Sequence, residues 1–65
     1  MILYDLFKVL DTQLIKCTVI ACALNSDTTI LDNGDLCMVD NKAMYYIVDR
    51  ITIKDKTLFI YVIER

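Results

Sequence analysis

Apolar positions repeat with two different periods along this chain, and the change of period separates a short helix from a series of strands. Near the start, apolar side chains follow the spacing i, i+3, i+4 and i+7, at Leu3, Leu6, Phe7 and Leu10. This spacing places them on one stripe of a helix of about two turns. Asp5 in the first turn and Lys8 toward the end both suit the helix dipole, and Asp11-Thr12 offers a stop.

From Leu14 onward the period becomes two, which is typical of a half-buried strand. One face of this strand carries Ile15, Cys17, Val19, Ala21 and Ala23. The opposite face is mixed and carries Leu14, Lys16, Thr18, Ile20 and Cys22. The turn-forming residues Asn25-Ser26-Asp27 end the strand.

Asn33-Gly34 is the strongest local signal, because both residues tolerate positive φ and favour a two-residue hairpin between apolar segments. In that hairpin Leu31 faces Leu36, and Ile30 faces Cys37. The flanking Asp32 and Asp35 would then be opposed like charges, which destabilises a sheet. A longer loop, or a site that attracts a cation or a basic partner, would relieve this repulsion.

The last twenty-one residues predict a second hairpin, with strands over residues 45–54 and 57–63 joined by a tight turn at Asp55-Lys56. On one face Ile53 pairs with Leu58 and Ile51 with Ile60, and Val62 continues the row. Strict alternation adds Ile47 and Asp49 to this face. The opposite face then carries Tyr46, Val48, Phe59, Tyr61 and Ile63.

A chain of 65 residues has little material with which to cover two faces of a sheet, because a domain of this size buries only about 60% of its unfolded surface. The helix stripe can cover the face of Ile51 and Ile60. We therefore expect a homodimer that closes the other face over Phe59 and Tyr61. The expected fold is α+β in one domain, residues 1–65, with an N-terminal helix on an antiparallel sheet of about four strands that can curl toward a small barrel.

Composition narrows the class of protein. Hydrophobic residues make up 57% of the chain, but long apolar runs such as residues 19–24 and 58–63 are still far shorter than the ~20 residues of a spanning helix. The N-terminus lacks the basic flank of a secretory signal, so we expect a cytoplasmic protein. The three cysteines have no Cys-x-x-Cys spacing and the chain has no histidine. We expect reduced thiols buried as small apolar side chains, with no metal, no cofactor and no enzymatic activity.

Charge is distributed unevenly along a chain whose formal net charge is −2. Between Cys17 and Asn41 there is no Lys or Arg, but there are Asp27, Asp32, Asp35 and Asp40. Divalent-metal binding is one interpretation, although the spacing does not match a calcium loop. The other is a surface that attracts a basic partner protein, and for this role we select Asp32, Asp35 and Asp40.

The C-terminal third supports a competing prediction. Tyr45, Tyr46, Phe59 and Tyr61 could stack the bases of single-stranded nucleic acid. The basic residues Arg50, Lys54, Lys56 and Arg65 lie on or near the same hairpin. Against this, the acidic chain as a whole disfavours non-specific binding to phosphates, and Tyr and Phe are also enriched in ordinary protein interfaces.

Three short motifs stand out: Leu3-Tyr4-Asp5-Leu6-Phe7-Lys8-Val9-Leu10-Asp11, Asp32-Asn33-Gly34-Asp35-Leu36, and Ile47-Val48-Asp49-Arg50-Ile51 followed by Leu58-Phe59-Ile60-Tyr61-Val62. Together they resemble small orphan proteins of bacteriophages and prophages, which open with such a helix, carry an Asn-Gly turn and close on such a hairpin. The resemblance implies a phage accessory role, and this group includes inhibitors of bacterial defence nucleases of the anti-CRISPR type. We therefore expect a non-catalytic inhibitor of a host protein. No functional residue is carried over.

Overall fold

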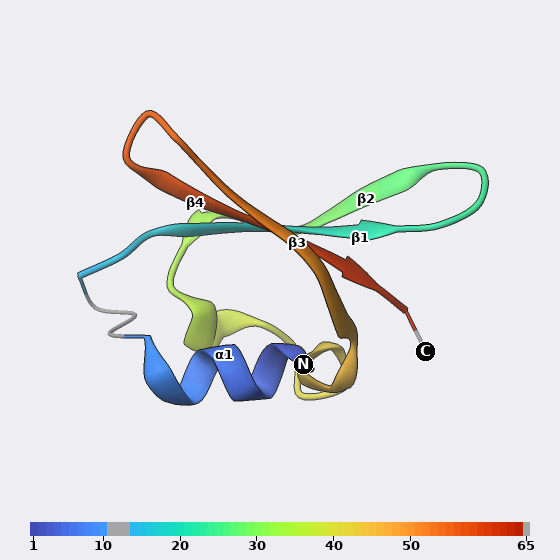
Figure 1. Ribbon diagram of the computed structural model, residues 1–65, viewed down its shortest axis with the longest axis horizontal. Helices are drawn as coiled ribbons and strands as arrows, with labels where there is room; N and C mark the ends of the chain where they lie inside the picture. Colours follow the sequence, from blue (N-terminus) through green and yellow to red (C-terminus); the bar gives the residue numbers. More distant parts are fainter. Residues whose placement is uncertain (11–13, 65) are drawn as a thin grey trace.

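The computed structural model describes residues 1–10 and 14–64 and shows a four-stranded sheet with a short helix on one side of it (Figure 1). The elements are α1 (Leu3–Val9), β1 (Cys17–Cys22), β2 (Asp27–Gly34), the 3₁₀ helices η1 (Leu36–Met38) and η2 (Ala43–Tyr45), β3 (Ile47–Lys54) and β4 (Thr57–Ile63). The predicted α+β class is confirmed. The predicted helix stop at Asp11-Thr12 and the basic residue Arg65 lie outside the described residues.

Helix α1 uses the predicted stripe to pack on the sheet. Leu3 and Leu6 are buried, and Phe7 and Leu10 pack against the same core. At the start of the helix, the Ile2 N–H donates to the Asp5 carboxylate over 3.1 Å, which satisfies a backbone donor that has no partner within the helix. The helical period in the sequence therefore predicted both the element and its buried face.

Strands β3 and β4 form the predicted hairpin. Ile53 pairs with Leu58 and Ile51 with Ile60, as expected from a two-residue turn at Asp55-Lys56. Both turn residues have positive φ, 52° and 66°, which is the geometry of the hairpin turn that matches the twist of the flanking strands.

The sheet is mixed rather than fully antiparallel. Its strand order is β2-β1-β4-β3, and the two central strands, β1 and β4, run parallel. A parallel pair needs a long connection, and the chain between these strands supplies one that contains β2, η1, η2 and β3. Strands β2 and β3 remain at opposite edges, so the sheet does not close into a barrel.

The hairpin predicted at Asn33-Gly34 is wrong. Strand β2 pairs with β1, and the chain then leaves the sheet so that Leu36 is fully buried in η1. Asn33 does have positive φ, 48°, but it lies in a β-bulge of β2. Its N–H donates to Thr18 Oγ1 over 3.1 Å, and its Oδ1 accepts a bond from Thr57 Oγ1 over 3.5 Å. Leu31 therefore faces Val19 rather than Leu36.

A second correction concerns the start of β3, where the pairing with β4 shifts between Val48 and Arg50. The extra residue, Asp49, reverses the alternation on its N-terminal side. Val48 therefore pairs with buried Val62, and Tyr46 also packs against the core. Ile47 pairs with Ile63 on the opposite face. The predicted positions of Tyr46, Val48 and Ile47 were wrong for this reason.

The core lies between one face of the sheet and the layer of α1, η1 and η2 (Figure 1). Its buried side chains are Leu3, Leu6, Cys17, Val19, Leu36, Val39, Ala43, Met44, Ile60 and Val62. The N-terminus closes part of the β3 edge, because the Val48 N–H donates to the Met1 carbonyl and the Leu3 N–H donates to the Tyr46 carbonyl, each over 2.9 Å.

Candidate interaction surface

The sheet has one face that α1, η1 and η2 do not cover, and we call it the open face (Figure 1). The expectation that the helix covers the whole opposite face was wrong toward the tip of the β3–β4 hairpin, where Ile51 and Ile53 are 41% and 76% exposed. Residues that pair directly across neighbouring strands point to the same face. Strand pairing therefore places six side chains there that are apolar: Ile20, Cys22, Ile47, Phe59, Tyr61 and Ile63. Ile47 and Ile63 are 41% and 43% exposed, and the other four are half-buried.

Three of the five residues predicted for self-association lie on the open face: Phe59, Tyr61 and Ile63. Tyr46 and Val48 lie on the covered side. Sequence reasoning missed Ile20 and Cys22, which belong to the mixed face of the first predicted strand. Only the parallel pairing of β1 with β4 brings Ile20 beside Tyr61 and Cys22 beside Ile63.

At the centre of the open face, the Arg50 guanidinium lies 4.4 Å from the centroid of the Tyr61 ring. This cation–π contact occupies one side of the ring. The predicted stacking platform is also divided, because Tyr45 belongs to η2 and Tyr46 packs against the core. Only Phe59 and Tyr61 of the four aromatic residues share this face.

The three aspartates predicted to bind a basic partner occupy different environments. Asp35 accepts a 2.8 Å bond from Lys16 Nζ, and this hydrogen bond, followed by the attraction between the two charges, raises the pKa of Lys16. Asp40 accepts bonds from the Lys42 N–H through its carboxylate and from the Ala43 N–H through its carbonyl. Asp32 is exposed on β2. Within residues 1–10 and 14–64, no group of three or more His, Cys, Asp or Glu residues could hold a metal ion.

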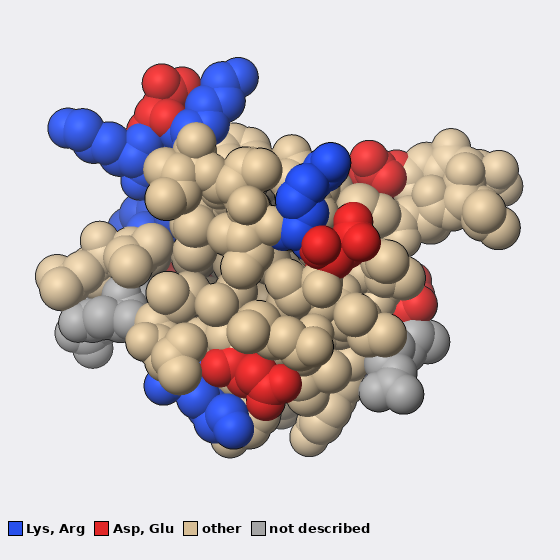
Figure 2. Space-filling view, in the orientation of Figure 1, with Lys and Arg blue, Asp and Glu red and all other residues tan. Residues whose placement is uncertain are grey.

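The β3–β4 hairpin carries opposite charges at its two ends. Lys54 and Lys56 are exposed at its tip around Asp55, and Figure 2 shows the basic side chains gathered where this hairpin turns in Figure 1. Asp49 and Glu64 are exposed at the other end.

Nearby acidic groups also act on Cys22, which is half-buried at the end of β1. Burial raises the pKa of the Cys22 thiol, and the negative charges of Asp27 and Asp49 raise it further, while Arg50 opposes them. The two carboxylates therefore lie close enough to influence this end of the open face. Arg50 accompanies the two carboxylates at this end, whereas the hairpin tip carries Lys54 and Lys56 around Asp55.

The three thiols are free but differ in exposure. Cys17 is fully buried in the core, and burial raises the pKa of its thiol. Cys37 is exposed in η1. The prediction of buried, apolar thiols is therefore confirmed for Cys17 and wrong for Cys37, because residue 37 lies in η1 beside buried Leu36 rather than in a strand.

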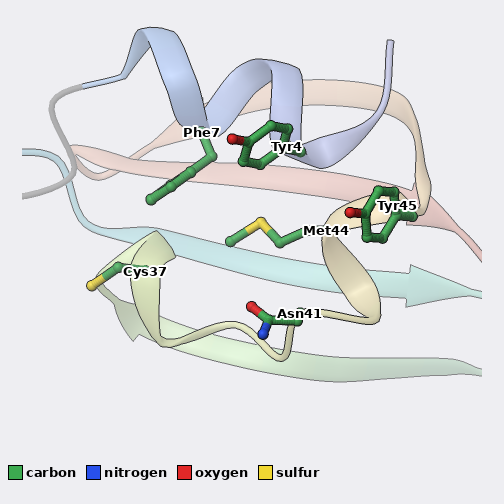
Figure 3. A pocket seen from close by; sticks show the side chains of 6 residues that line it. All are labelled: Tyr4, Phe7, Cys37, Asn41, Met44 and Tyr45. Carbon is green, nitrogen blue, oxygen red and sulfur yellow. The ribbon is translucent and has the colours of Figure 1, made fainter.

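A groove of about 260 Å³ lies on the other side of the molecule, between α1 and the segment that holds η1 and η2 (Figure 3). Its lining residues are Tyr4, Phe7, Cys37, Asn41, Met44 and Tyr45. Met44 lies between the aromatic side chains of α1 and the Asn41 amide (Figure 3). The groove is smaller than the ~300–1,000 Å³ of most small-molecule sites. A hollow of about 400 Å³ lies instead at the end of the open face, beside Cys22 and Ile63.

Comparisons with protein-family models, with curated protein sequences and with solved structures found no match to this chain. Among the described residues, no helix has the length and apolar character needed to cross a membrane. The candidate surface therefore rests on the geometry of this chain alone.

Proposed function

We propose that this protein is a non-catalytic interaction module that binds a protein of a bacterial host through its open face. The observation that carries the proposal is the set of six apolar side chains on this face, which the covering layer of α1, η1 and η2 does not reach. Removing apolar surface from water contributes about 25 cal/mol per Å². A partner that covers this face gains that contribution, and Tyr and Phe are enriched at such contacts.

The face is a better binding surface than either edge of the sheet, because both edges carry features that oppose the addition of a strand. In the pairing of β1 with β2, two register shifts each leave an extra residue in β2. Strand β3 has its own bulge at Asp49, and Met1–Leu3 already pairs with its N-terminal part. Bulges twist an edge and interrupt its row of hydrogen-bonding groups.

The class of partner comes from the resemblance to small phage proteins. That group includes inhibitors of bacterial defence nucleases, so the finer proposal is a phage accessory protein that inhibits such a nuclease in the cytoplasm of the host. An inhibitor needs only a stable surface that competes with a substrate or blocks a movement of its target. The open face, built on four hydrogen-bonded strands, would provide that surface.

Single-stranded nucleic acid is the competing ligand for the same face. Lys54 and Lys56 at the hairpin tip would attract phosphates. The Arg50 contact with Tyr61 opposes base stacking, because it occupies a ring surface that a base would need. Protein binding is therefore the better-supported function.

A capture experiment with matched variants tests the proposal. In the open-face variant, Ile47→Lys is combined with Ile63→Glu, two exposed positions that pair directly across β3 and β4. The new opposite charges can pair, so the sheet keeps a favourable cross-strand contact. The control variant combines Val9→Glu with Met38→Lys, at positions that are 76% and 75% exposed on α1 and η1. Both variants receive the same two charges.

Each protein is immobilised and exposed to a bacterial host lysate, and captured proteins are identified by mass spectrometry. We expect a host protein that the unmodified chain and the control variant retain and the open-face variant loses. A third variant, Asp32→Asn with Asp40→Asn, is expected to retain it. Loss of capture in this third variant alone would assign binding to the acidic segment, and capture of oligonucleotides that weakens steeply with salt would favour the nucleic-acid function.

A further inference from the structure

We infer that the free protein is a two-fold symmetric dimer, in which two copies pack open face to open face and the tip of each β3–β4 hairpin lies over the far end of the partner's hairpin. This inference rests on the proposed function, because it names what covers the open face when no host protein is bound. Its basis is the distribution of charge around the apolar face, together with the dimensions of that face.

Charge is complementary along the β3–β4 hairpin. The tip carries Lys54 and Lys56 around Asp55, and the opposite end carries Asp49 and Glu64. The residues between them, Tyr61 and Phe59, point to the open face. Arg50 also lies at this centre, with its guanidinium over the Tyr61 ring. A surface with a basic end, a centre that holds Phe59 and Tyr61 with Arg50, and an acidic end is complementary to its own copy when that copy is reversed.

Symmetry determines which ends meet. A two-fold axis that lies between the sheets and runs across the strands places β3–β4 over the partner's β3–β4 in the opposite direction. Lys54 and Lys56 of each copy then approach Asp49 and Glu64 of the other. An axis that runs along the strands would instead place like ends of the two sheets together. The charges therefore favour the first arrangement, and two-fold pairing is the commonest closed symmetry.

The dimensions of the face indicate a weak dimer. Four strands spaced ~4.8 Å apart, with six residues that each rise ~3.3 Å, give a face of about 19 by 20 Å, or roughly 400 Å² in each copy. A standard stable interface takes ~800 Å² from each partner. We therefore expect a dimer that separates on dilution, so that a host protein can replace the second copy.

Sedimentation equilibrium on the full chain tests the dimer, with two charge-reversal variants. The tip variant combines Lys54→Glu with Lys56→Glu, and the end variant combines Asp49→Lys with Glu64→Lys. Each alone is expected to weaken dimerisation at least tenfold, and their mixture is expected to form a heterodimer. The control combines Lys8→Glu with Lys42→Glu, on α1 and beside η2. It has the same net charge as the tip variant and is expected to dimerise like the unmodified chain.

Circular dichroism confirms that each variant is folded before its mass is measured. A mass of 7.5 kDa for the unmodified chain at all concentrations, or a dimer that both charge variants leave unchanged, overturns the inference. If the chain is monomeric and host capture still depends on Ile47 and Ile63, the dimer is wrong and the proposed function stands. If the dimer forms as described and the open-face variant still captures the host protein, the inference stands and the proposed function fails.

Discussion

Replacing Leu36 by alanine tests whether the chain leaves the sheet after β2 and anchors η1 in the core. Leu36 has no exposed surface, whereas Met38, two residues later in η1, is 75% exposed. Truncation to alanine removes the same number of heavy atoms from each side chain. The two variants therefore differ mainly in whether the removed atoms were surrounded by protein or by water.

The expected magnitudes are well separated. Truncation of a buried leucine costs about 2–5 kcal/mol, through lost burial and the cavity that remains. A chain of 65 residues, at ~0.05–0.15 kcal/mol per residue, has a total stability of about 3–10 kcal/mol. Leu36→Ala is thus expected to remove a large part of the free energy of unfolding, at about 4–8 °C of melting temperature per kcal/mol. Met38→Ala is expected to change it by less than about 0.5 kcal/mol.

Urea unfolding followed by far-ultraviolet circular dichroism measures both variants against the unmodified chain. All three are compared at one protein concentration, because the inferred dimer would make stability depend on concentration. A strand over residues 36–39 would place Leu36 and Met38 on the same face. Equal losses from the two substitutions would therefore refute the position of Leu36 in η1.

Three further outcomes are expected. Asn33→Ala should lower the free energy of unfolding by about 1–2 kcal/mol, because alanine is strained at a φ of 48°. In urea unfolding, Asn33→Gly should lower it by less, and an equal decrease would assign the effect to the side-chain hydrogen bond instead. Because the pKa of Lys16 is raised in the folded protein, its ion pair contributes stability that is fully present below pH 10.5, the ordinary pKa, and is lost as the pH rises through the higher folded pKa. The melting temperature should therefore fall at alkaline pH, and Asp35→Asn should flatten this fall. An unchanged fall would show that the ion pair does not cause it. A thiol reagent applied to the folded protein should label exposed Cys37 first and buried Cys17 last; mass spectrometry of the peptides gives the order, and early labelling of Cys17 would contradict its place in the core.

The parts of the fold that the sequence predicted are those with short-range causes. The stripe from Leu3 to Leu10 has a helical period, and a stripe of this width needs only one apolar surface to pack on. The β3–β4 hairpin follows from the two-residue turn at Asp55-Lys56, because turn length sets the register of the strands beside it. The same local reasoning correctly placed positive φ at Asn33, but not the bulge that uses it.

Which side chains share the open face depended on strand pairing and on a bulge, neither of which is set by local sequence. A one-residue bulge exchanges the faces of all residues beyond it. Asp49 was the one charge on an otherwise apolar predicted face, but this break in the pattern did not by itself identify an extra residue. Ile47 therefore reached the open face, while Val48 moved to the core. The prediction that Phe59, Tyr61 and Ile63 share one face is confirmed, because they lie on β4, whose alternation the bulge in β3 does not change.

By itself, the sequence determined that the chain forms a short helix and a C-terminal hairpin, and that its strands carry more apolar surface than one covering layer can bury. The tertiary structure alone decided that β1 lies parallel to β4 and that η1 enters the core through Leu36. The physical reason is that a local pattern shows only whether a side chain needs an apolar or a polar environment. Many segments distant in the sequence could provide that environment. Only simultaneous packing of the whole chain selects among them. Here that selection buries Ile60 and Val62 on one face of the sheet, leaves Ile53 exposed, and places Ile20 beside Tyr61 on the other face.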